Sequence, residues 1–111
     1  MFNFNMEEIT AIELKKWIDE GSDFQLIDVR EPHEAEIARI PQAKLIPLGS
    51  LPSRLEEIDA GKTAVVHCRS GVRSAKAIEF LRAKGFENRL LNLKGGILAW
   101  SDEVDPTVPK Y

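Results

Sequence analysis

The sequence contains few residues that bind metals or form disulfide bonds. It has one cysteine, Cys68, and two histidines, His33 and His67, among 111 residues. A single cysteine excludes a disulfide framework and a metal site built from several cysteines. Two histidines far apart in the sequence do not predict a zinc site with it. We therefore expect no metal and no other cofactor, and Cys68 is either an inert buried residue or a reactive thiol.

Long apolar runs are also missing. No run approaches the roughly 20 residues that a helix needs to cross a bilayer. The first eight residues hold no cationic stretch followed by an apolar segment, so we expect no signal peptide and a cytoplasmic protein. The formal net charge is -3, from 15 basic and 18 acidic side chains, which disfavours nucleic acid and anionic membranes as partners. The length predicts one domain.

Segments with helical spacing of apolar residues alternate with short apolar runs typical of buried strands. We expect strands over 24–29, 45–46, 63–67 and 89–93. We expect helices between Thr10 and Gly21, over 31–36 and 51–58, between Ser74 and Gly85, and over 97–100. Strands that alternate with helices predict an α/β fold with a parallel sheet covered on both faces.

The first expected helix carries a start signal and an apolar face. Thr10 and Glu13 have the spacing of a capping box. Ile12, Leu14 and Trp17 recur at helical spacing, so we expect them to lie on the apolar face of this helix.

Cys68 stands where a buried strand is expected to end and a helix to begin. Ligands of an open α/β sheet bind at the carboxyl ends of the strands, and the first N–H groups of a helix favour an anion. We interpret Ser74 as the N-cap of that helix. This placement predicts a stabilised, exposed thiolate at Cys68, which is the reactive form of cysteine.

The residues around Cys68 strengthen this prediction. Arg69 and Arg73 bring positive charge, and Gly71 lets the loop curl so that its N–H groups converge on one point. Ser70 can stabilise the bend or donate to an anion. The loop is therefore suited to a sulfur anion or to a small oxyanion such as thiosulfate, and these neighbours favour a reactive cysteine over an inert one.

Three segments resemble the rhodanese-like sulfurtransferases. The sequence CRSGVRS at 68–74 resembles the active-site loop of that family, DVREP at 28–32 its N-terminal signature, and LKGGI at 93–97, followed by Trp100, its C-terminal signature. The tail VDPTVPKY at 104–111 is similar to the end of rhodanese domains fused to adenylating enzymes of molybdopterin and thiamine-type sulfur transfer. The resemblance implies one rhodanese-like domain over 1–111, with a core at about 9–101, an extended tail at 102–111, and a parallel five-stranded sheet flanked by helices on both faces.

The resemblance also implies a chemistry. Cys68 would take the outer sulfur of a donor such as thiosulfate, hold it as a persulfide and pass it to a thiophilic acceptor. The terminal sulfur would be held by the backbone N–H groups of Arg69, Ser70, Gly71, Val72 and Arg73. The arginine side chains would draw in and orient an anionic donor.

The single cysteine also bears on the partners. No second thiol in this chain can resolve the persulfide, so the sulfur must leave to cyanide, a small thiol or a partner protein such as a ubiquitin-like sulfur carrier. Thiosulfate and a cysteine desulfurase that offers a persulfide both remain candidate donors.

Two other functions compete with sulfur transfer. One is a regulatory binding module that keeps the fold without the chemistry, and such a module usually lacks the cysteine. The other is a phosphatase of related architecture, which uses Cys, five residues, then Arg. Here four residues separate Cys68 from Arg73, and Ser74 occupies the phosphatase arginine position. A shorter loop makes a tighter cradle, which suits sulfur better than a tetrahedral phosphate.

One segment departs from the family pattern. Residues 38–43 read ARIPQA where the family often has GHIPGA, so Ala38, Arg39 and Gln42 replace two glycines and a histidine. Because glycine commonly marks a backbone conformation that other residues resist, we expect the local turn to differ.

Three polar residues next to the expected strand ends have a structural and a functional interpretation. Asp28 and Arg30 end one strand and would support the site, although a structural ion pair or a helix cap is the favoured interpretation. His67 directly precedes Cys68, so its side chain is expected on the opposite face of the strand, as a satisfied core histidine rather than a general base.

Overall fold

Five parallel strands form one sheet in the order β1-β5-β4-β2-β3, in a computed structural model that describes residues 6–111. The strands are β1 (Glu8–Ile9), β2 (Gln25–Asp28), β3 (Lys44–Leu45), β4 (Ala64–His67) and β5 (Leu90–Leu93). The helices are α1 (Ala11–Asp19), α2 (Pro32–Ile37), α3 (Val72–Ala83) and α4 (Gly96–Glu103), with two 3-10 helices, η1 (Leu48–Ser53) and η2 (Leu55–Glu57). The predicted parallel α/β sheet is confirmed.

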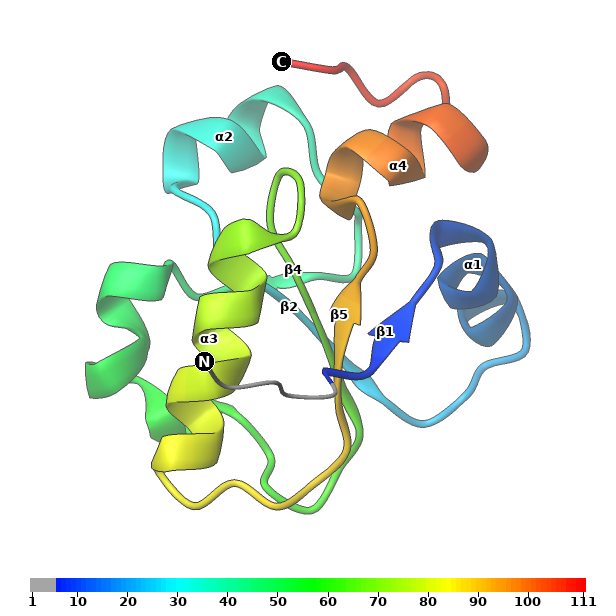
Figure 1. The fold of residues 1–111 in the computed structure, drawn as a ribbon. Coiled ribbons are helices and arrows are strands. Elements are labelled where there is room, and N and C mark those ends of the chain that lie inside the picture. The colour runs from blue at the N-terminus through cyan, green and yellow to red at the C-terminus, as the bar shows by residue number, and fades with distance from the viewer. Residues whose placement is uncertain (1–5) are drawn as a thin grey trace.

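Helices cover both faces of this sheet. Figure 1 shows α3 with η1 and η2 on one side and α1 with α4 on the other. Alternate residues of each strand point to opposite faces. Val65 therefore packs with Leu26 in the core under α1 and α4, whereas Val66 packs with Ile27 in the core under α3. The two cores fix the sheet rigidly, and with it the position of each strand's carboxyl end.

The first helix begins as the sequence predicts. The Thr10 side chain accepts a hydrogen bond from the Glu13 amide, and the Glu13 carboxylate accepts one from the Thr10 amide, which completes the capping box. Leu14 is fully buried, but Ile12 is 61% exposed. The expected position of Ile12 on the apolar face is wrong, because Ala11 and Leu14 turn toward the sheet instead.

Two elements differ from the sequence-based expectations. Strand β1 was not expected, since two residues are too few for any periodicity to be visible. The helix expected over 51–58 is replaced by the separate 3-10 helices η1 and η2. Pro52 lies inside this segment and has no N–H to donate to an earlier carbonyl, which favours short 3-10 turns over a continuous α-helix.

The segment that departs from the family pattern adopts an ordinary backbone. Ala38 has φ -154° and ψ 136°, and among residues 6–111 only glycines have positive φ. Neither Ala38 nor Gln42 therefore occupies a conformation that requires glycine. A hydrogen bond from the Ala43 amide to the Ile40 carbonyl, at 3.0 Å, closes the turn.

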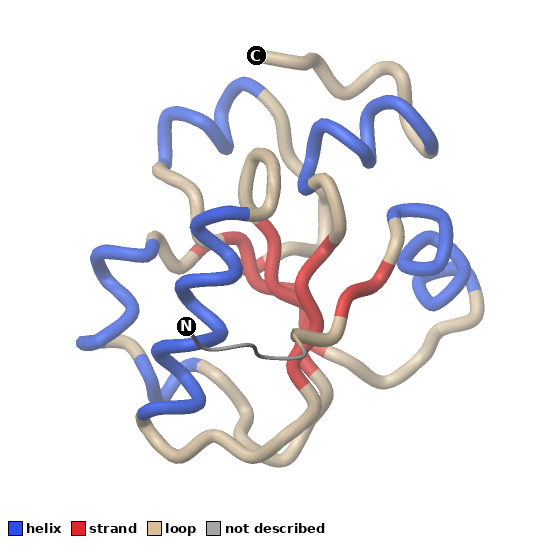
Figure 2. Tube along the Cα trace, in the orientation of Figure 1, coloured by secondary structure: helices blue, strands red, loops and turns tan. Residues whose placement is uncertain are grey.

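The C-terminal tail is not a free extended segment. Val108 is buried against the core, and the Ser101 hydroxyl donates to its carbonyl over 2.6 Å. Figure 2 shows the tail as a loop that returns across the end of the molecule near α2 and α4. The tail thereby brings Tyr111 beside the loop that follows β4.

No helix within residues 6–111 has the length and apolar character needed to span a membrane. The expectation about a signal peptide concerns the start of the chain, and residues 1–5 lie outside the described part.

Candidate active site

Cys68 directly follows β4, and four residues later the chain enters α3. This loop stands at the carboxyl edge of the sheet, between α2 and α4, as Figure 1 shows. The site therefore lies where strand ends and a helix start meet, which is the usual place for a ligand in an open α/β sheet.

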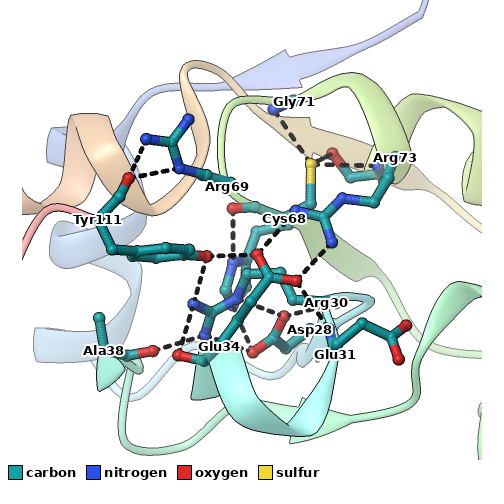
Figure 3. A network of polar contacts seen from close by, with 12 residues as sticks. Asp28, Arg30, Glu31, Glu34, Ala38, Cys68, Arg69, Gly71, Arg73 and Tyr111 are labelled. Carbon is teal, nitrogen blue, oxygen red and sulfur yellow. Dashed lines mark hydrogen bonds and ion pairs between the residues drawn. The ribbon is translucent and has the colours of Figure 1, made fainter. Parts of the chain in front are cut away.

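The sulfur of Cys68 sits inside a cradle of donors. The Gly71 amide donates to Sγ over 3.1 Å and the Ser74 amide over 3.4 Å, while the Ser74 hydroxyl oxygen lies 3.3 Å from Sγ. Figure 3 shows the loop curled around the sulfur. Cys68 is only 1% exposed, so the expectation of an exposed thiolate is wrong: the loop folds over the sulfur that it stabilises.

The cradle determines the charge state of the thiol. Burial alone raises the pKa of Cys68, but hydrogen bonds from Ser74, Gly71 and Ser70 outweigh it and lower the pKa below its usual value. A buried cysteine without such donors would be held as the neutral thiol. Cys68 is therefore a reactive candidate in spite of its burial.

The helix start differs from the predicted one. Gly71, with φ 116°, is the N-cap of α3, and Ser74 lies one turn further inside and is fully buried. The N-cap prediction for Ser74 is wrong, because the left-handed backbone at Gly71 starts the helix three residues earlier. Ser74 instead donates its amide to Cys68, and its hydroxyl oxygen lies within reach of Sγ.

Asn92 on β5 also belongs to the site, although it was not predicted from the sequence. Its amide nitrogen donates to the Gly71 carbonyl over 3.0 Å, and its amide oxygen accepts from the Ser74 hydroxyl over 2.6 Å. The one available signal was a polar residue within the otherwise apolar run LLNL of β5, which lies inside the sheet between β1 and β4.

The other side of the loop rests on the start of α4. The Ile97 amide donates to the Cys68 carbonyl over 3.0 Å, and the Leu98 amide donates to the Arg69 carbonyl over 3.2 Å. Gly96 makes this close approach possible: a Cβ atom there would lie 2.3 Å from the Arg69 carbonyl oxygen. The segment LKGGI is thus the support of the loop.

The two arginines of the loop are engaged by other parts of the chain. Arg73 makes a bidentate ion pair with Glu34 of α2, at 2.6 and 2.9 Å. The exposed Arg69 donates to the main-chain oxygen of Tyr111 and lies over its ring, 5.2 Å from the centroid. Figure 3 shows Arg69 turned toward Tyr111 and Arg73 between Glu34 and Cys68.

The ion pair of Glu34 and Arg73 is strong. Hydrogen bonds from Arg73 hold the pKa of the Glu34 carboxyl well below its usual range, and the same carboxylate raises the pKa of Arg73. Glu34 is therefore a charged, largely buried neighbour of the loop that was not predicted from the sequence. A glutamate in a short charged helix resembles any surface residue in sequence.

Asp28 and Arg30 form the structural ion pair that was the favoured interpretation. Arg30 is fully buried and holds the Asp28 carboxylate at 2.9 and 2.7 Å. It also donates to the Ala38 carbonyl over 2.7 Å and to the Tyr111 hydroxyl over 2.9 Å. Tyr111 in turn donates to Glu34 over 2.8 Å, and Glu34 pairs with Arg73 of the loop. The ion pair of Asp28 and Arg30 is therefore linked to the loop through Tyr111 and Glu34.

The remaining predicted residues take different positions. Ser70 and Val72 are exposed on the outer side of the loop. His67 is fully buried, and its Nδ1 lies 3.3 Å from the Cys68 carbonyl oxygen, but its Nε2 has no hydrogen-bond partner. Burial lowers the pKa of His67, so the ring is neutral. It is a core histidine as expected, but the expectation that both ring nitrogens would be satisfied is wrong, because Nε2 has no partner.

No group of three or more His, Cys, Asp or Glu side chains within residues 6–111 is arranged to hold a metal ion. The donors around Cys68 are amides, a hydroxyl and guanidinium groups, which suit an anion.

Comparison with known proteins adds the family context. The family model of the rhodanese-like domain matches residues 10–103. The putative sulfurtransferase YtwF of Bacillus subtilis is 39% identical over 101 residues, which cover 91% of this chain and 96% of YtwF. The crystal structure of a rhodanese-like domain protein from Staphylococcus aureus is similar with a TM-score of 0.81 and 39% identity, covering 89% of this chain and 95% of that one.

A second kind of relative is much longer. The probable adenylyltransferase/sulfurtransferase MoeZ of Mycobacterium tuberculosis is 40% identical over 105 residues, which cover 93% of this chain but 26% of MoeZ. This chain therefore corresponds to about a quarter of that relative. The predicted likeness to domains fused to adenylating enzymes is confirmed.

Proposed function

The chain belongs to the rhodanese-like family of sulfurtransferases, and from this premise we propose that Cys68 takes a sulfur atom from a donor such as thiosulfate and carries it as a persulfide. The observation that carries the proposal is the cradle: two backbone amides and one hydroxyl oxygen surround Sγ, and hydrogen bonds from Ser74, Gly71 and Ser70 lower the pKa of the thiol. An inert core cysteine has no need of such donors.

The loading step requires a thiolate and a leaving group. The Cys68 thiolate attacks the outer sulfur of thiosulfate, a new S–S bond forms, and the S–S bond of the donor breaks with its electron pair leaving on sulfite. The negative charge then resides on the terminal sulfur of the persulfide. Backbone N–H groups of the loop, from Arg69, Ser70, Gly71, Val72 and Arg73, are proposed to hold this charge.

The discharge step reverses the roles of the sulfur atoms. A nucleophile on the acceptor attacks the terminal sulfur, the persulfide S–S bond breaks, and Cys68 leaves as a thiolate that the cradle again stabilises. Cyanide, a small thiol or a protein can serve as acceptor. Because Sγ is buried under its loop, we expect an acceptor group that is small or carried on a flexible chain end, as in a ubiquitin-like sulfur carrier.

The similarity to MoeZ supports a ubiquitin-like sulfur carrier as the acceptor. That relative is a probable adenylyltransferase/sulfurtransferase, so its name pairs the two activities in one protein. We propose the same pairing for this domain, with the adenylyltransferase in the same or another chain. A free reactive thiol persists in a reducing compartment, which supports the cytoplasm as its location.

The other site residues are proposed to act through the loop. Asp28 and Arg30 hold it from below, and the Ser74 amide donates to the sulfur from α3. Arg69 and Arg73 orient an anionic donor once it displaces their present partners, Tyr111 and Glu34.

Intact-mass measurement after incubation with thiosulfate tests the proposal. We expect a gain of one sulfur atom, its loss on addition of cyanide, and no gain in Cys68→Ala. If the wild type gains no sulfur from thiosulfate or from a persulfide donor, the protein is a binding module rather than a carrier. Hydrolysis of an aryl phosphate that depends on Cys68 would instead favour the phosphatase, which the short loop argues against.

A further inference from the structure

The side chain of Asn92 has only one possible orientation. Its amide nitrogen lies 3.0 Å from the Gly71 carbonyl oxygen, which can only accept a hydrogen bond, and 3.9 Å from the Met6 sulfur, a weak acceptor. The reverse orientation would place two oxygens face to face at a site that is 5% exposed. The amide oxygen of Asn92 therefore points at Ser74.

That orientation decides where the Ser74 hydroxyl proton lies. A hydroxyl has one proton, and the amide oxygen of Asn92, 2.6 Å from Ser74 Oγ, can only accept it. While Cys68 is a neutral thiol, its S–H donates to Ser74 Oγ across 3.3 Å. The thiol, the Ser74 hydroxyl and the Asn92 amide oxygen then each have a hydrogen-bond partner.

A thiolate at Cys68 upsets this arrangement. If the hydroxyl proton stays with Asn92, the thiolate faces the lone pairs of Ser74 Oγ. If the hydroxyl rotates to donate to the sulfur, the buried amide oxygen of Asn92 loses its donor, which costs free energy. The two acceptors therefore compete for one proton.

We propose that Asn92 is a positioning residue: its amide oxygen holds the Ser74 hydroxyl proton, which is thereby withheld from the Cys68 thiolate and stays with Asn92 when the sulfur is loaded. This inference rests on the proposed persulfide chemistry. In the persulfide Sγ is a neutral divalent sulfur and the charge lies one atom further out, so Ser74 donates to Asn92 without penalty. Asn92 thus favours the loaded state over the free thiolate.

A consequence for the two half-reactions follows. Withholding the proton makes the thiolate more basic, hence a stronger nucleophile in loading and a poorer leaving group in discharge. Substitution of Asn92 should slow the loading of sulfur, measured as the rate per Cys68 thiolate. It should speed the discharge of sulfur to a given acceptor.

The test is a double-mutant cycle on the unloaded protein, read by the pH dependence of iodoacetamide alkylation of Cys68. Asn92→Leu, which keeps the branched shape of the side chain, should lower the pH midpoint of alkylation by about half to one pH unit, because Ser74 is then free to donate to the thiolate. Ser74→Ala should also lower the midpoint, because it removes the oxygen that accepts from the neutral thiol and turns its lone pairs toward the thiolate. A raised midpoint in Ser74→Ala would show that the hydroxyl donates to the thiolate in the wild type and would overturn the inference. In the Ser74→Ala background, Asn92→Leu should have no effect.

The cycle separates the proposal from a merely structural role. Loosening of the loop through the lost bond to Gly71 would raise the midpoint and would do so equally without Ser74, which would overturn the inference, as would an unchanged midpoint. Asn92→Ala serves as a second variant that introduces no clash, and thermal unfolding checks that each variant is folded. Alkylation needs no sulfur transfer, so failure of the protein to load sulfur would overturn the proposed function and leave the cycle decisive for Asn92.

Discussion

The thiol of Cys68 combines burial with a lowered pKa, and these two properties normally oppose each other. Burial alone favours the neutral thiol, and the hydrogen bonds from Ser74, Gly71 and Ser70 favour the thiolate more strongly. The donors come from the loop and from the first turn of α3. A single residue is thus both a core side chain and a candidate nucleophile.

This balance predicts the pH dependence of Cys68 reactivity. The alkylation midpoint of the folded wild type should lie below the value of an unperturbed cysteine, about 8.5, and should return to it in urea. A group with a lowered native pKa adds stability that is full above the unfolded value and is lost as the pH falls through the native value. The unfolding free energy of the wild type should therefore rise relative to Cys68→Ala as the pH increases across that window. An alkylation midpoint of the native protein equal to that in urea would contradict the stabilisation of the thiolate by the cradle.

The pair of Glu34 and Arg73 predicts donor selectivity. Glu34→Gln removes a negative charge beside the loop and releases one of the hydrogen bonds that hold Arg73. We expect the KM for thiosulfate to fall several-fold, with a smaller change in kcat, because a dianion then meets a freer guanidinium. Glu36→Gln, on the exposed side of the same helix, is the matched control and should leave KM unchanged. An increased KM in Glu34→Gln would show that the pair itself orients the donor.

The same pair predicts a loss of stability on acidification. The Glu34 carboxyl has a lowered pKa, so its contribution is present above the ordinary glutamate value, about 4.3, and disappears as the pH falls toward the native value. At neutral pH, Glu34→Gln should be less stable by about 1–2 kcal/mol, a modest figure because the Arg73 side chain is 34% exposed. Urea unfolding at several pH values should show the two proteins converging below about pH 4.

Among the secondary-structure elements, α4 supports the loop through a close backbone contact. The backbone of Gly96 passes so near to Cys68 and Arg69 that a Cβ atom would lie 2.3 to 2.7 Å from their backbone atoms. Gly96→Ala should therefore displace the loop, abolish most sulfur loading and lower the unfolding free energy by roughly 2–4 kcal/mol.

Gly21→Ala is the control for backbone strain alone. Gly21 has φ 67°, close to the 60° of Gly96, but nothing lies within 4 Å of an added Cβ. We expect a cost of about 1 kcal/mol and unchanged loading by mass. Equal effects of the two substitutions would mean that the approach of α4 to the loop has no part in function.

Local sequence signals predicted some of these elements well and others poorly. The capping box at Thr10 and the apolar runs of β2, β4 and β5 act over a few residues, so they are readable in one sequence. The start of α3 was misplaced because a serine is a better N-cap than glycine by preference alone, whereas here the loop needs positive φ at Gly71.

The contacts that complete the site were not predictable in this way. Glu34, Asn92 and Tyr111 reach the loop from 39, 21 and 42 positions away along the chain. No periodicity or motif links residues at such distances, and only the packing of the sheet brings them together. Cys68 and its loop, by contrast, were visible because the motif is contiguous.

Across the chain, the tail joins regions that are far apart in sequence. The hydroxyl of Tyr111 accepts from the buried Arg30 and donates to Glu34, and its ring lies beside Arg69. Removing that hydroxyl leaves one guanidinium nitrogen of Arg30 with a single long contact, 3.4 Å to the Glu34 carbonyl. The tail therefore stabilises the support of the loop as well as covering the core at Val108.

This arrangement predicts energetic coupling between the tail and α2. Tyr111→Phe should lower the unfolding free energy by about 1–2 kcal/mol, since a buried donor loses its partner. Lys110→Ala, which removes only an exposed ion pair with Asp102, should change it by no more than about 0.5 kcal/mol. In a double-mutant cycle, Tyr111→Phe and Glu34→Gln should couple by about 0.5–1 kcal/mol, because the Tyr111 hydroxyl bonds to the carboxylate of Glu34. Strict additivity in urea unfolding would mean that the tail packs on the core without supporting the ion pair that holds Arg73.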